Sequence, residues 1–415
     1  MSLLGQRLAA TAVVLWVIGI AATNVLADAL PDSTWVALKP LPHMGRSAVF
    51  ALAVDPSNNQ SLVVGNTDGS LLRSTNGGAT WTTVHTGKAT LTTITYSPVT
   101  PGVVLAGTRG SGALLSRDGG VSWSSAAGLE GRAVRVFAFA LNLVAAGTDH
   151  GVYVSADGNT WSQSGLPNPS INSLAVEAIH APVRLVAGSD SQPSSGTLPL
   201  YQSVDAGATW TTFNPPISGT IAVKITAGPL PPTGNVRPLM VGTNTGLFAS
   251  TDNGATFTSL SGGVLLPATD YTQVSFIGDH FDRFYAASDG GGSKSGGLWR
   301  SNDAGQSFVS LQPPEASVTA LAVSNDEQPV LYVATFHPST HTASLWAYHD
   351  TGDQPQGPPS TASPVASGTR TTHPGNESIV SQILGAPQLP YVGLGLGALA
   401  VVMTAVLAHL RGRYR

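Results

Sequence analysis

Short stretches in which apolar and polar residues alternate recur along most of the chain, and they have the period and length of β-strands. They are rich in β-branched and aromatic residues, and glycine and proline separate them. The stretches group into units, in which an innermost strand is predicted to be followed by a second strand ending in a Gly-Thr-like pair and then by a third strand. The predicted innermost strands of seven such units are Ala48 to Val54, Leu91 to Tyr96, Ala133 to Phe139, Ile171 to Val176, Ile221 to Ile225, Tyr271 to Ile277 and Ser317 to Val323. The pattern therefore predicts an all-β chain of repeated units.

An eight-residue motif, Ser-x-Asp-x-Gly-x-Thr-Trp, occurs in six near-complete copies between Ser74 and Phe308. Successive copies begin 42, 39, 48, 47 and 51 residues apart, which is the period of one four-stranded propeller blade. The acid or amide at the third position is expected to bind nearby backbone N–H groups in a tight turn, and the aromatic residue to pack between blades. The residues with these structural roles are Asn76, Asp118, Asp157, Asp205, Asp252, Asp303, Trp81, Trp123, Trp161, Trp210, Phe257 and Phe308.

The motif resembles the Asp-box, or BNR, repeat of sialidase-like β-propellers, and the resemblance covers Thr34 to Tyr348. It implies a ring of blades whose Asp-box turns lie on the outside, away from the ligand-binding face, so that the repeated aspartates are structural rather than catalytic or metal-binding. Non-enzymatic propellers with this repeat include sortilin-type receptors and photosystem assembly factors, both of which bind proteins. The resemblance therefore leaves both a binding protein and an enzyme open.

The two ends of the predicted propeller, residues 34–349, complement each other. The seventh unit reaches Trp346-Ala347-Tyr348 without a fourth strand, while Thr34 to Leu38, before the first full unit, has the pattern of a fourth strand. We therefore expect a seven-bladed β-propeller in which the N-terminal strand completes the last blade, a closure that leaves no open sheet edge.

Both termini carry apolar segments. Residues 1–27 are predicted to be a secretory signal peptide, or else an uncleaved anchor, because an apolar run follows Arg7 and ends in small residues. Residues 350–389, rich in Pro, Ser, Thr and Gly, are predicted to be a stalk. Residues 390–410 read as a transmembrane helix, and the arginines of residues 411–415 place this tail in the cytoplasm. The segment LPYVG at Leu389 is a less favoured alternative, a degenerate wall-sorting signal.

The amino-acid composition excludes several classes of function. Only 10% of the residues are charged and the net charge is −4, so no basic field is present to hold nucleic acid. Cysteine is absent, which excludes disulfides, thiolate catalysis and cysteine-based zinc sites. The two histidines at His337 and His341 are interpreted as exposed loop residues, since Pro338 argues against a helix that would present both to a metal. No cofactor and no metal are expected.

Candidate ligand-binding residues cluster on one predicted face, which carries the loops that lead into the innermost strands. The residues are Arg46, Arg109, Arg132, Arg135 and His150. Convergent arginines could bind a carboxylate, a phosphate or an acidic protein segment; the alternative is that these are scattered solubilising charges. Carboxylates expected around the same rim are Asp68, Asp149, Asp190, Asp270, Asp289 and Glu315.

The sequence favours a membrane-tethered, extracytoplasmic propeller that binds a protein or glycan partner without catalysis. The alternative is a glycan hydrolase, either sialidase-like or with Asp149 and Asp289 as its two carboxylates. The arginine and Tyr-Glu pattern that sialidases require is not evident in the sequence, although Tyr271 is placed near the mouth of the ring. Arg237, Arg283 and Arg300 fall on turns or third strands away from the predicted face.

Overall fold

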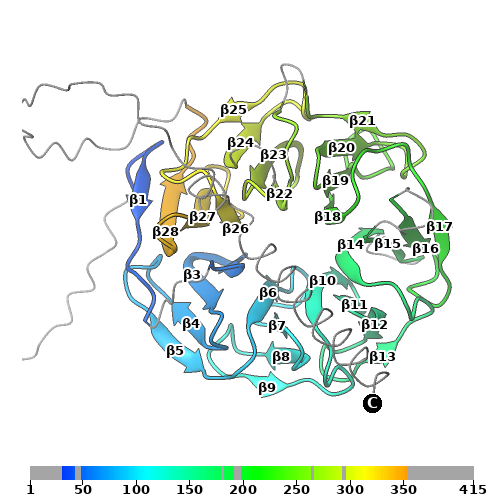
Figure 1. Ribbon diagram of the computed structural model, residues 1–415, viewed down its shortest axis with the longest axis horizontal. Coiled ribbons are helices and arrows are strands. Elements are labelled where there is room, and N and C mark those ends of the chain that lie inside the picture. Colours follow the sequence, from blue (N-terminus) through cyan, green and yellow to red (C-terminus); the bar gives the residue numbers. More distant parts are fainter. Residues whose placement is uncertain are drawn as a thin grey trace, which may run out of the picture.

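The computed structural model describes residues 30–42, 48–178, 182–190, 198–262, 266–291 and 296–353. Seven antiparallel sheets of four strands each are arranged around a common axis, so the described chain is an all-β seven-bladed propeller (Figure 1). The predicted fold class and blade number are confirmed, and no helix occurs among these residues. None of the described residues forms a helix that could cross a membrane. The predicted signal peptide, most of the stalk, the transmembrane helix and the basic tail lie outside the described residues.

Each blade runs outward from the axis in the order of its strands, except that the N-terminal strand is the outer strand of blade seven. The innermost strands are β2 (Ala51–Asp55), β6 (Leu91–Tyr96), β10 (Val134–Ala140), β14 (Ile171–Ala178), β18 (Ala222–Ala227), β22 (Gln273–Ile277) and β26 (Val318–Val323). The second strands are β3 (Asn58–Gly65), β7 (Val104–Thr108), β11 (Leu143–Thr148), β15 (Arg184–Ser189), β19 (Leu239–Thr243), β23 (His280–Ser288) and β27 (Val330–His337).

The two outer positions of each sheet are occupied by shorter strands in most blades. The third strands are β4 (Leu71–Ser74), β8 (Ala113–Ser116), β12 (Gly151–Ser155), β16 (Leu200–Ser203), β20 (Leu247–Ser250), β24 (Gly297–Ser301) and β28 (Thr342–His349). The outer strands are β5 (Thr82–His85), β9 (Ser124–Ser125), β13 (Ser162–Gln163), β17 (Thr211–Phe213), β21 (Thr258–Ser259), β25 (Val309–Ser310) and β1 (Trp35–Ala37). All seven predicted innermost segments form strands, with ends displaced by a few residues.

The innermost strands of five blades share one irregularity. Their pairing with the second strand skips one residue near the start, so that this residue forms a β-bulge. The bulge residues are Thr92, Arg135, Asn172, Val223 and Thr319. A bulge residue is not paired with the second strand, so its side chain is not bound to the regular alternation of the sheet. The same position in successive blades can therefore hold polar side chains that interact with other groups.

The ring closes as the sequence predicts. Strand β1 pairs antiparallel with β28, with Trp35 opposite Tyr348 and Ala37 opposite Trp346. The Trp35 indole N–H donates a hydrogen bond of 2.8 Å to the carbonyl of Leu311, and the Trp35 and Tyr348 ring centroids lie 4.8 Å apart. Because both rings are buried, this closure joins blades six and seven to the N-terminal segment.

A buried ion pair holds the chain where it leaves the last blade. The guanidinium of Arg300 on β24 donates to the Asp350 carboxylate, which also accepts hydrogen bonds from the Tyr285 hydroxyl and the Gly352 backbone N–H. Arg300 and Asp350 are 2% and 1% exposed. Arg300 also donates to the carbonyl of Gly352 at 2.7 Å. Residues 350–353, which the sequence assigns to the stalk, therefore pack against blade six.

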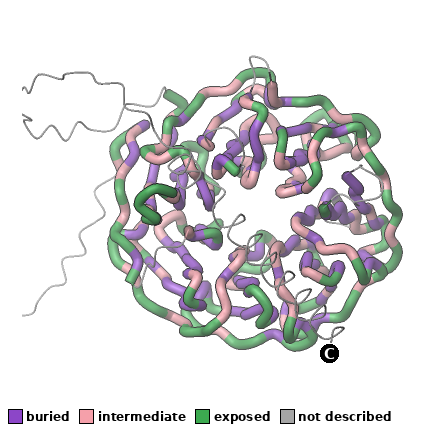
Figure 2. The backbone as a smooth tube through the Cα atoms, in the orientation of Figure 1, coloured by how far each residue is buried: buried purple, intermediate pink, exposed green. Residues whose placement is uncertain are grey.

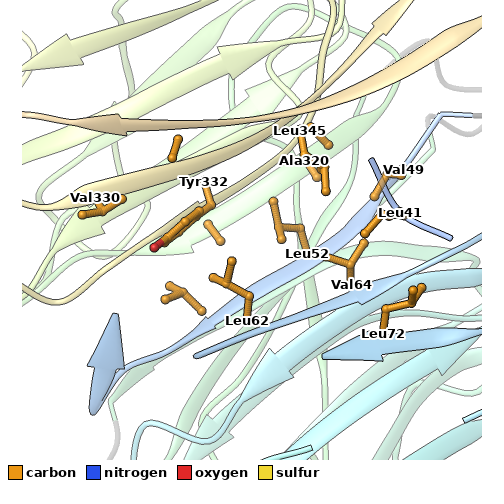
Figure 3. Close-up of a cluster of buried hydrophobic side chains, with 14 residues drawn as sticks. Leu41, Val49, Leu52, Leu62, Val64, Leu72, Ala320, Val330, Tyr332 and Leu345 are labelled. Atoms are coloured by element: carbon orange, nitrogen blue, oxygen red, sulfur yellow. The ribbon is translucent and has the colours of Figure 1, made fainter. Parts of the chain in front are cut away.

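Apolar side chains fill the spaces between neighbouring blades. The cluster between blades seven and one contains Leu52, Leu62 and Val64 on one side and Tyr332 and Leu345 on the other (Figure 3). Buried positions follow the sheets around the ring, while exposed positions are frequent at its outer rim (Figure 2). Burial of apolar surface between blades is thus the main source of stability in a chain without disulfides.

The six repeated turns have a common hydrogen-bond pattern, shown well by the copy in blade four. The buried Ser203 hydroxyl donates to a carboxylate oxygen of Asp205 at 2.7 Å and accepts from the Asp205 and Gly207 backbone N–H groups. The same carboxylate accepts from the Thr209 N–H at 2.8 Å and the Thr209 hydroxyl at 2.5 Å. Gly207 has a φ of 90°, the left-handed conformation that favours glycine.

The first residue of the turn is as important as the acid that the sequence pattern emphasises. The serine is buried in all six copies: Ser74, Ser116, Ser155, Ser203, Ser250 and Ser301. Its hydroxyl accepts hydrogen bonds from two backbone N–H groups and donates one to the carboxylate. In the Ser116 copy the two N–H groups are those of Asp118 and Gly120, and the carboxylate is that of Asp118. The repeat is therefore conserved in geometry around the ring even where the aromatic residue changes from Trp to Phe.

The turns provide an internal pH test. Hydrogen bonds from Thr209 and Thr256 hold the pKa values of Asp205 and Asp252 at about 2, whereas Asn76 occupies the same position in blade one and does not titrate. A depressed pKa means that the bonds persist above the ordinary carboxyl pKa and are lost as the pH falls toward 2. We expect the NMR shifts of the Thr209 and Thr256 amides to titrate near pH 2.

The Thr80 amide, bound to the Asn76 side-chain oxygen at 2.9 Å, is the matched control and should not move over this range. Equal titration of all three amides would show that global acid unfolding, rather than protonation of the turn carboxylates, causes the change.

Candidate functional site

The antiparallel order of each blade places the loops that lead into innermost strands and the loops that join second to third strands on one face, here called the front face. The repeated turns join third to outer strands and lie on the other face. Front-face loops of neighbouring blades touch: Arg109, after β7, forms an isolated antiparallel bridge with Ala133, which precedes β10. Asp190, after β15, forms the same kind of bridge with Ile221, which precedes β18.

Among the candidate ligand-binding arginines that the structure describes, Arg135 has the most firmly set position. It is the bulge residue of β10, and its Nη1 donates to the Ser170 hydroxyl and, at 2.9 Å, to the Asn172 side-chain oxygen. Asn172 is the bulge residue of β14 and donates in turn to Asp190 at 2.6 Å. Nε and Nη2 of Arg135 have no hydrogen-bond partner among the described residues. The guanidinium is therefore oriented by one nitrogen and keeps free donors for a ligand.

Arg132 and Arg109 differ in how they are held. The half-buried Arg132 donates from Nε to the Tyr153 hydroxyl at 3.0 Å, and its guanidinium carbon lies 5.9 Å from the Tyr153 ring centroid. Arg109 is exposed and is placed only by its backbone, whose N–H donates to the Thr90 carbonyl at 2.9 Å. Both flank the segment around Ala133 that leads to Arg135.

Asp149 and His150 lie beside these arginines on the front face. One Asp149 carboxylate oxygen accepts the Ala133 backbone N–H at 3.0 Å, and the other lies 3.2 Å from Nδ1 of the exposed His150. Asp149 therefore fixes the loop that carries Arg132 and leads into β10, and this structural task occupies the carboxylate. Together with the arginines it forms the blade 2–4 sector, which we define as Arg109, Arg132, Arg135, Asp149, His150, Ser170, Asn172 and Asp190.

The structure brings together four of the five predicted ligand-binding residues, Arg109, Arg132, Arg135 and His150, while Arg46 lies outside the described residues. Sequence reasoning missed Ser170 and Asn172. A signal for Asn172 was available: it occupies the second position of an innermost strand, as Arg135 does one blade earlier. Aligning the blades by that position would have paired the two residues.

The remaining rim carboxylates are spread over other blades. Asp68 accepts hydrogen bonds from the backbone and hydroxyl of Ser70, and Glu315 accepts from the Thr335 and Ser344 hydroxyls. Asp149 and Asp289, proposed as a hydrolytic pair, belong to blades three and six, on opposite sides of the ring (Figure 1). The structure therefore does not bring these two carboxylates together.

Asp289 has a different carboxylate neighbour. The Asp270 carboxyl is buried and accepts from the Ser288 hydroxyl at 2.7 Å, and a Cβ placed on Gly291 would lie 3.0 Å from oxygens of both Asp270 and Asp289. Burial, together with the hydrogen bond and charge of Asp270, raises the pKa of Asp289 to about 7. Near neutral pH a large fraction of Asp289 therefore stays protonated.

This pair predicts a loss of stability as the pH rises. A folded-state pKa above the unfolded value of about 4 means that folding favours the protonated form, so stability falls between about pH 4 and pH 7. Asp289→Asn keeps a donor toward Asp270 and should flatten that dependence, raising stability at pH 8 by about 1 to 3 kcal/mol relative to the wild type. Urea unfolding at several pH values measures this.

Asp190→Asn is the control, because Asp190 is an exposed front-face carboxylate with an amide partner. If both variants retain the wild-type pH dependence, another group is responsible for it.

His337 is the last residue of β27 and interacts with the Ser339 hydroxyl at 3.0 Å, while His341 lies in the β27–β28 loop with its ring packed edge-on to Phe336. Both histidines are exposed. Within the described ranges, no group of three or more His, Cys, Asp or Glu side chains is arranged to hold a metal ion.

No protein-family model matches the chain, and no curated protein matches it. Among solved structures, YCF48 from Cyanidioschyzon merolae is similar at 16% identity and a TM-score of 0.53, over 76% of this chain and 99% of that one. A structure of YCF48 bound to D1 peptide matches at 15% identity and a TM-score of 0.52, over 76% and 94% of the two chains. An ancestral GH74 enzyme matches at 16% identity and a TM-score of 0.47, over 74% and 55%. The two YCF48 similarities agree with the propeller fold.

Proposed function

We propose that the chain is an extracytoplasmic binding or assembly scaffold, tethered to the membrane by its C-terminal helix, that holds a protein or glycan partner on the front face without catalysis. In this proposal the repeated turns are Asp boxes, and the protein belongs to the non-enzymatic branch of the sialidase-like β-propellers. Export through residues 1–27, the stalk and the anchor at residues 390–410 rest on the sequence pattern alone.

The observation that carries the proposal is Arg135. Ser170 and Asn172 hold one end of its guanidinium, and the free nitrogens remain available for a carboxylate or another acidic group of the partner. Such pre-orientation lowers the entropy lost on binding. The complex of YCF48 with a D1 peptide shows that a propeller of this shape can hold a protein segment.

The hydrolase alternative is less well supported. Its two nominal carboxylates are in separate blades, Asp149 is bound to the Ala133 backbone, and burial together with Asp270 raises the pKa of Asp289. Tyr271 does not have the environment of a nucleophile, because its hydroxyl donates to the Pro267 carbonyl and burial raises its pKa.

The test is capture of a partner from host membranes by the full chain, followed by quantification of its retention. Arg135→Gln should reduce retention about tenfold or more, because it removes the charge and the free guanidinium donors. Arg117→Gln is the matched control: Arg117 is exposed on the turn face and donates to the Asp157 carbonyl. Equal retention by both variants, or turnover of a glycan array that Asp289→Asn abolishes, would contradict the proposal.

A further inference from the structure

A small apolar cavity opens on the turn face between blades five and six. It lies between the loop that joins β18 to β19 and the first residues of β23, two elements that are neighbours in the ring (Figure 1). Its apolar lining residues are Pro231, Val236, Pro238, Met240, Phe281 and Ala304. The cavity volume is about 280 Å³, close to the lower limit of about 300 Å³ for ligand pockets. The cavity therefore holds a few apolar side chains rather than a folded element.

The wall that blade five contributes is specific to that blade. Residues 228–238 join β18 to β19, and this connection is the longest of the seven that lead from an innermost strand to a second strand. Leu230, next to the lining residue Pro231, is 50% exposed. The added loop thus borders the cavity with apolar surface that the described chain does not cover, which indicates an occupant outside the described residues.

The described chain ends on the same face of the ring. Arg300 lies at the end of β24, where the repeated turn of blade six begins, and it donates to the carbonyl of Gly352 at 2.7 Å. Ala304, in the wall of the cavity, belongs to that turn. Residues 354–415 therefore start on the turn face beside blade six, the blade that supplies one wall of the cavity.

The chain beyond this point contains a short apolar cluster ahead of the predicted transmembrane helix. Residues 377–384, with the sequence ESIVSQIL, place large apolar side chains at positions 379, 380, 383 and 384 in a stretch otherwise rich in Pro, Ser, Thr and Gly. About 25 residues separate Asp353 from Ile379, and a random coil of that length spans about 25 to 30 Å on average. Such a tether gives an effective concentration on the order of 1 mM, so a modest contact is sufficient for docking.

We infer that residues 377–384 dock in the cavity between blades five and six of the same chain and place their apolar side chains inside it. Docking removes apolar surface of both the cavity and the segment from water. The inference does not require the scaffold function proposed above. With the membrane anchor of that proposal, docking would hold the turn face toward the bilayer and leave the front face open to a partner.

The chain has no cysteine, so introduced cysteines report the contact without background. In the full-length protein, Asn235→Cys at the cavity is combined with Ser381→Cys in the segment, and a short bismaleimide cross-linker is added. Asn235 is an exposed lining residue, so its substitution should not disturb the fold. The matched pair is Ser57→Cys with Ser381→Cys, because Ser57 is exposed in the corresponding turn of blade one. We expect about fivefold more intramolecular linking for the first pair.

Substitutions on each side identify the surfaces in contact. Ile383→Asp should reduce linking of the first pair to the level of the second, because a carboxylate is unfavourable in an apolar cavity. Val365→Asp, elsewhere in the same stretch, should leave it unchanged. Thr251→Trp, at an exposed lining residue, should also reduce linking by filling the cavity. Thr75→Trp, at the same position of the blade-one turn, is its control.

Equal linking of the two pairs overturns the inference, and it is the result expected if another occupant, such as a lipid chain, fills the cavity. Links between two molecules also overturn it, since they would assign the segment to a second copy. Linking that neither Ile383→Asp nor Thr251→Trp reduces would place the contact elsewhere. The measurement involves no partner protein, so failure of the scaffold proposal would not be mistaken for failure of this docking.

Discussion

Trp35→Ala is expected to lower the free energy of unfolding by about 3 to 5 kcal/mol, a large share of the stability of a typical domain. The substitution removes a 3% exposed indole from the contact with Tyr348 and leaves the Leu311 carbonyl without its donor. The loss concerns β1, which among the described residues is the strand that joins the two ends of the ring, so blades six and seven should be affected first. Guanidinium unfolding followed by circular dichroism measures it.

Trp35→Phe separates the two contributions. It retains an aromatic ring against Tyr348 and loses the N–H that binds Leu311, so it should cost about 1 to 2 kcal/mol. If Trp35→Ala unfolds at the same denaturant concentration as the wild type, the N-terminal strand contributes nothing to closure, and the ring must be stable with blade seven incomplete.

Asp350→Asn is expected to destabilise the protein by about 3 to 5 kcal/mol, because it leaves the Arg300 guanidinium buried without its counter-charge. The double variant Arg300→Met with Asp350→Asn removes both charges and should recover part of that loss. The same denaturation measurement applied to Asp350→Asn, to Arg300→Met and to the double variant gives the coupling energy between the two residues.

Asp32→Asn is the matched control for this prediction. Asp32 pairs with His349 at 2.8 Å, but its side chain is largely exposed, and exposed pairs contribute less than about 1 kcal/mol. A loss for Asp350→Asn no larger than that for Asp32→Asn would mean that water solvates Arg300 when its partner is removed.

The sequence predicted the ring because the same interactions recur in every blade. Alternation of apolar residues marks each innermost strand, and the turn motif repeats with the blade period, so local errors at strand ends do not change the number of blades. Blade seven lacked a fourth strand, and the strand at Trp35 had no blade of its own, so the sequence predicted that this strand completes blade seven. The pairing of β1 with β28 confirms this prediction.

The polar sites were harder to predict because their partners come from different blades. Nothing near Arg300 in the sequence indicates that its counter-charge is Asp350, since residues 350–389 have the composition of a stalk. Likewise Asp289 and Asp270 are separated by two strands, and their proximity depends on how β22 and β23 are joined to the loops at their ends. Periodicity identifies repeated positions; it does not identify contacts between non-equivalent ones.

Pairing of β1 with β28 also sets an order of events during biosynthesis. Strand β1 leaves the ribosome before the other described strands and has its partner at the far end of the propeller, so Trp35 stays without that partner until β28 has been made. Contacts between residues this distant in the sequence form slowly, and an unpaired strand is a hazard for aggregation during that interval. The brevity of this strand, three residues, limits how much backbone it exposes while it waits.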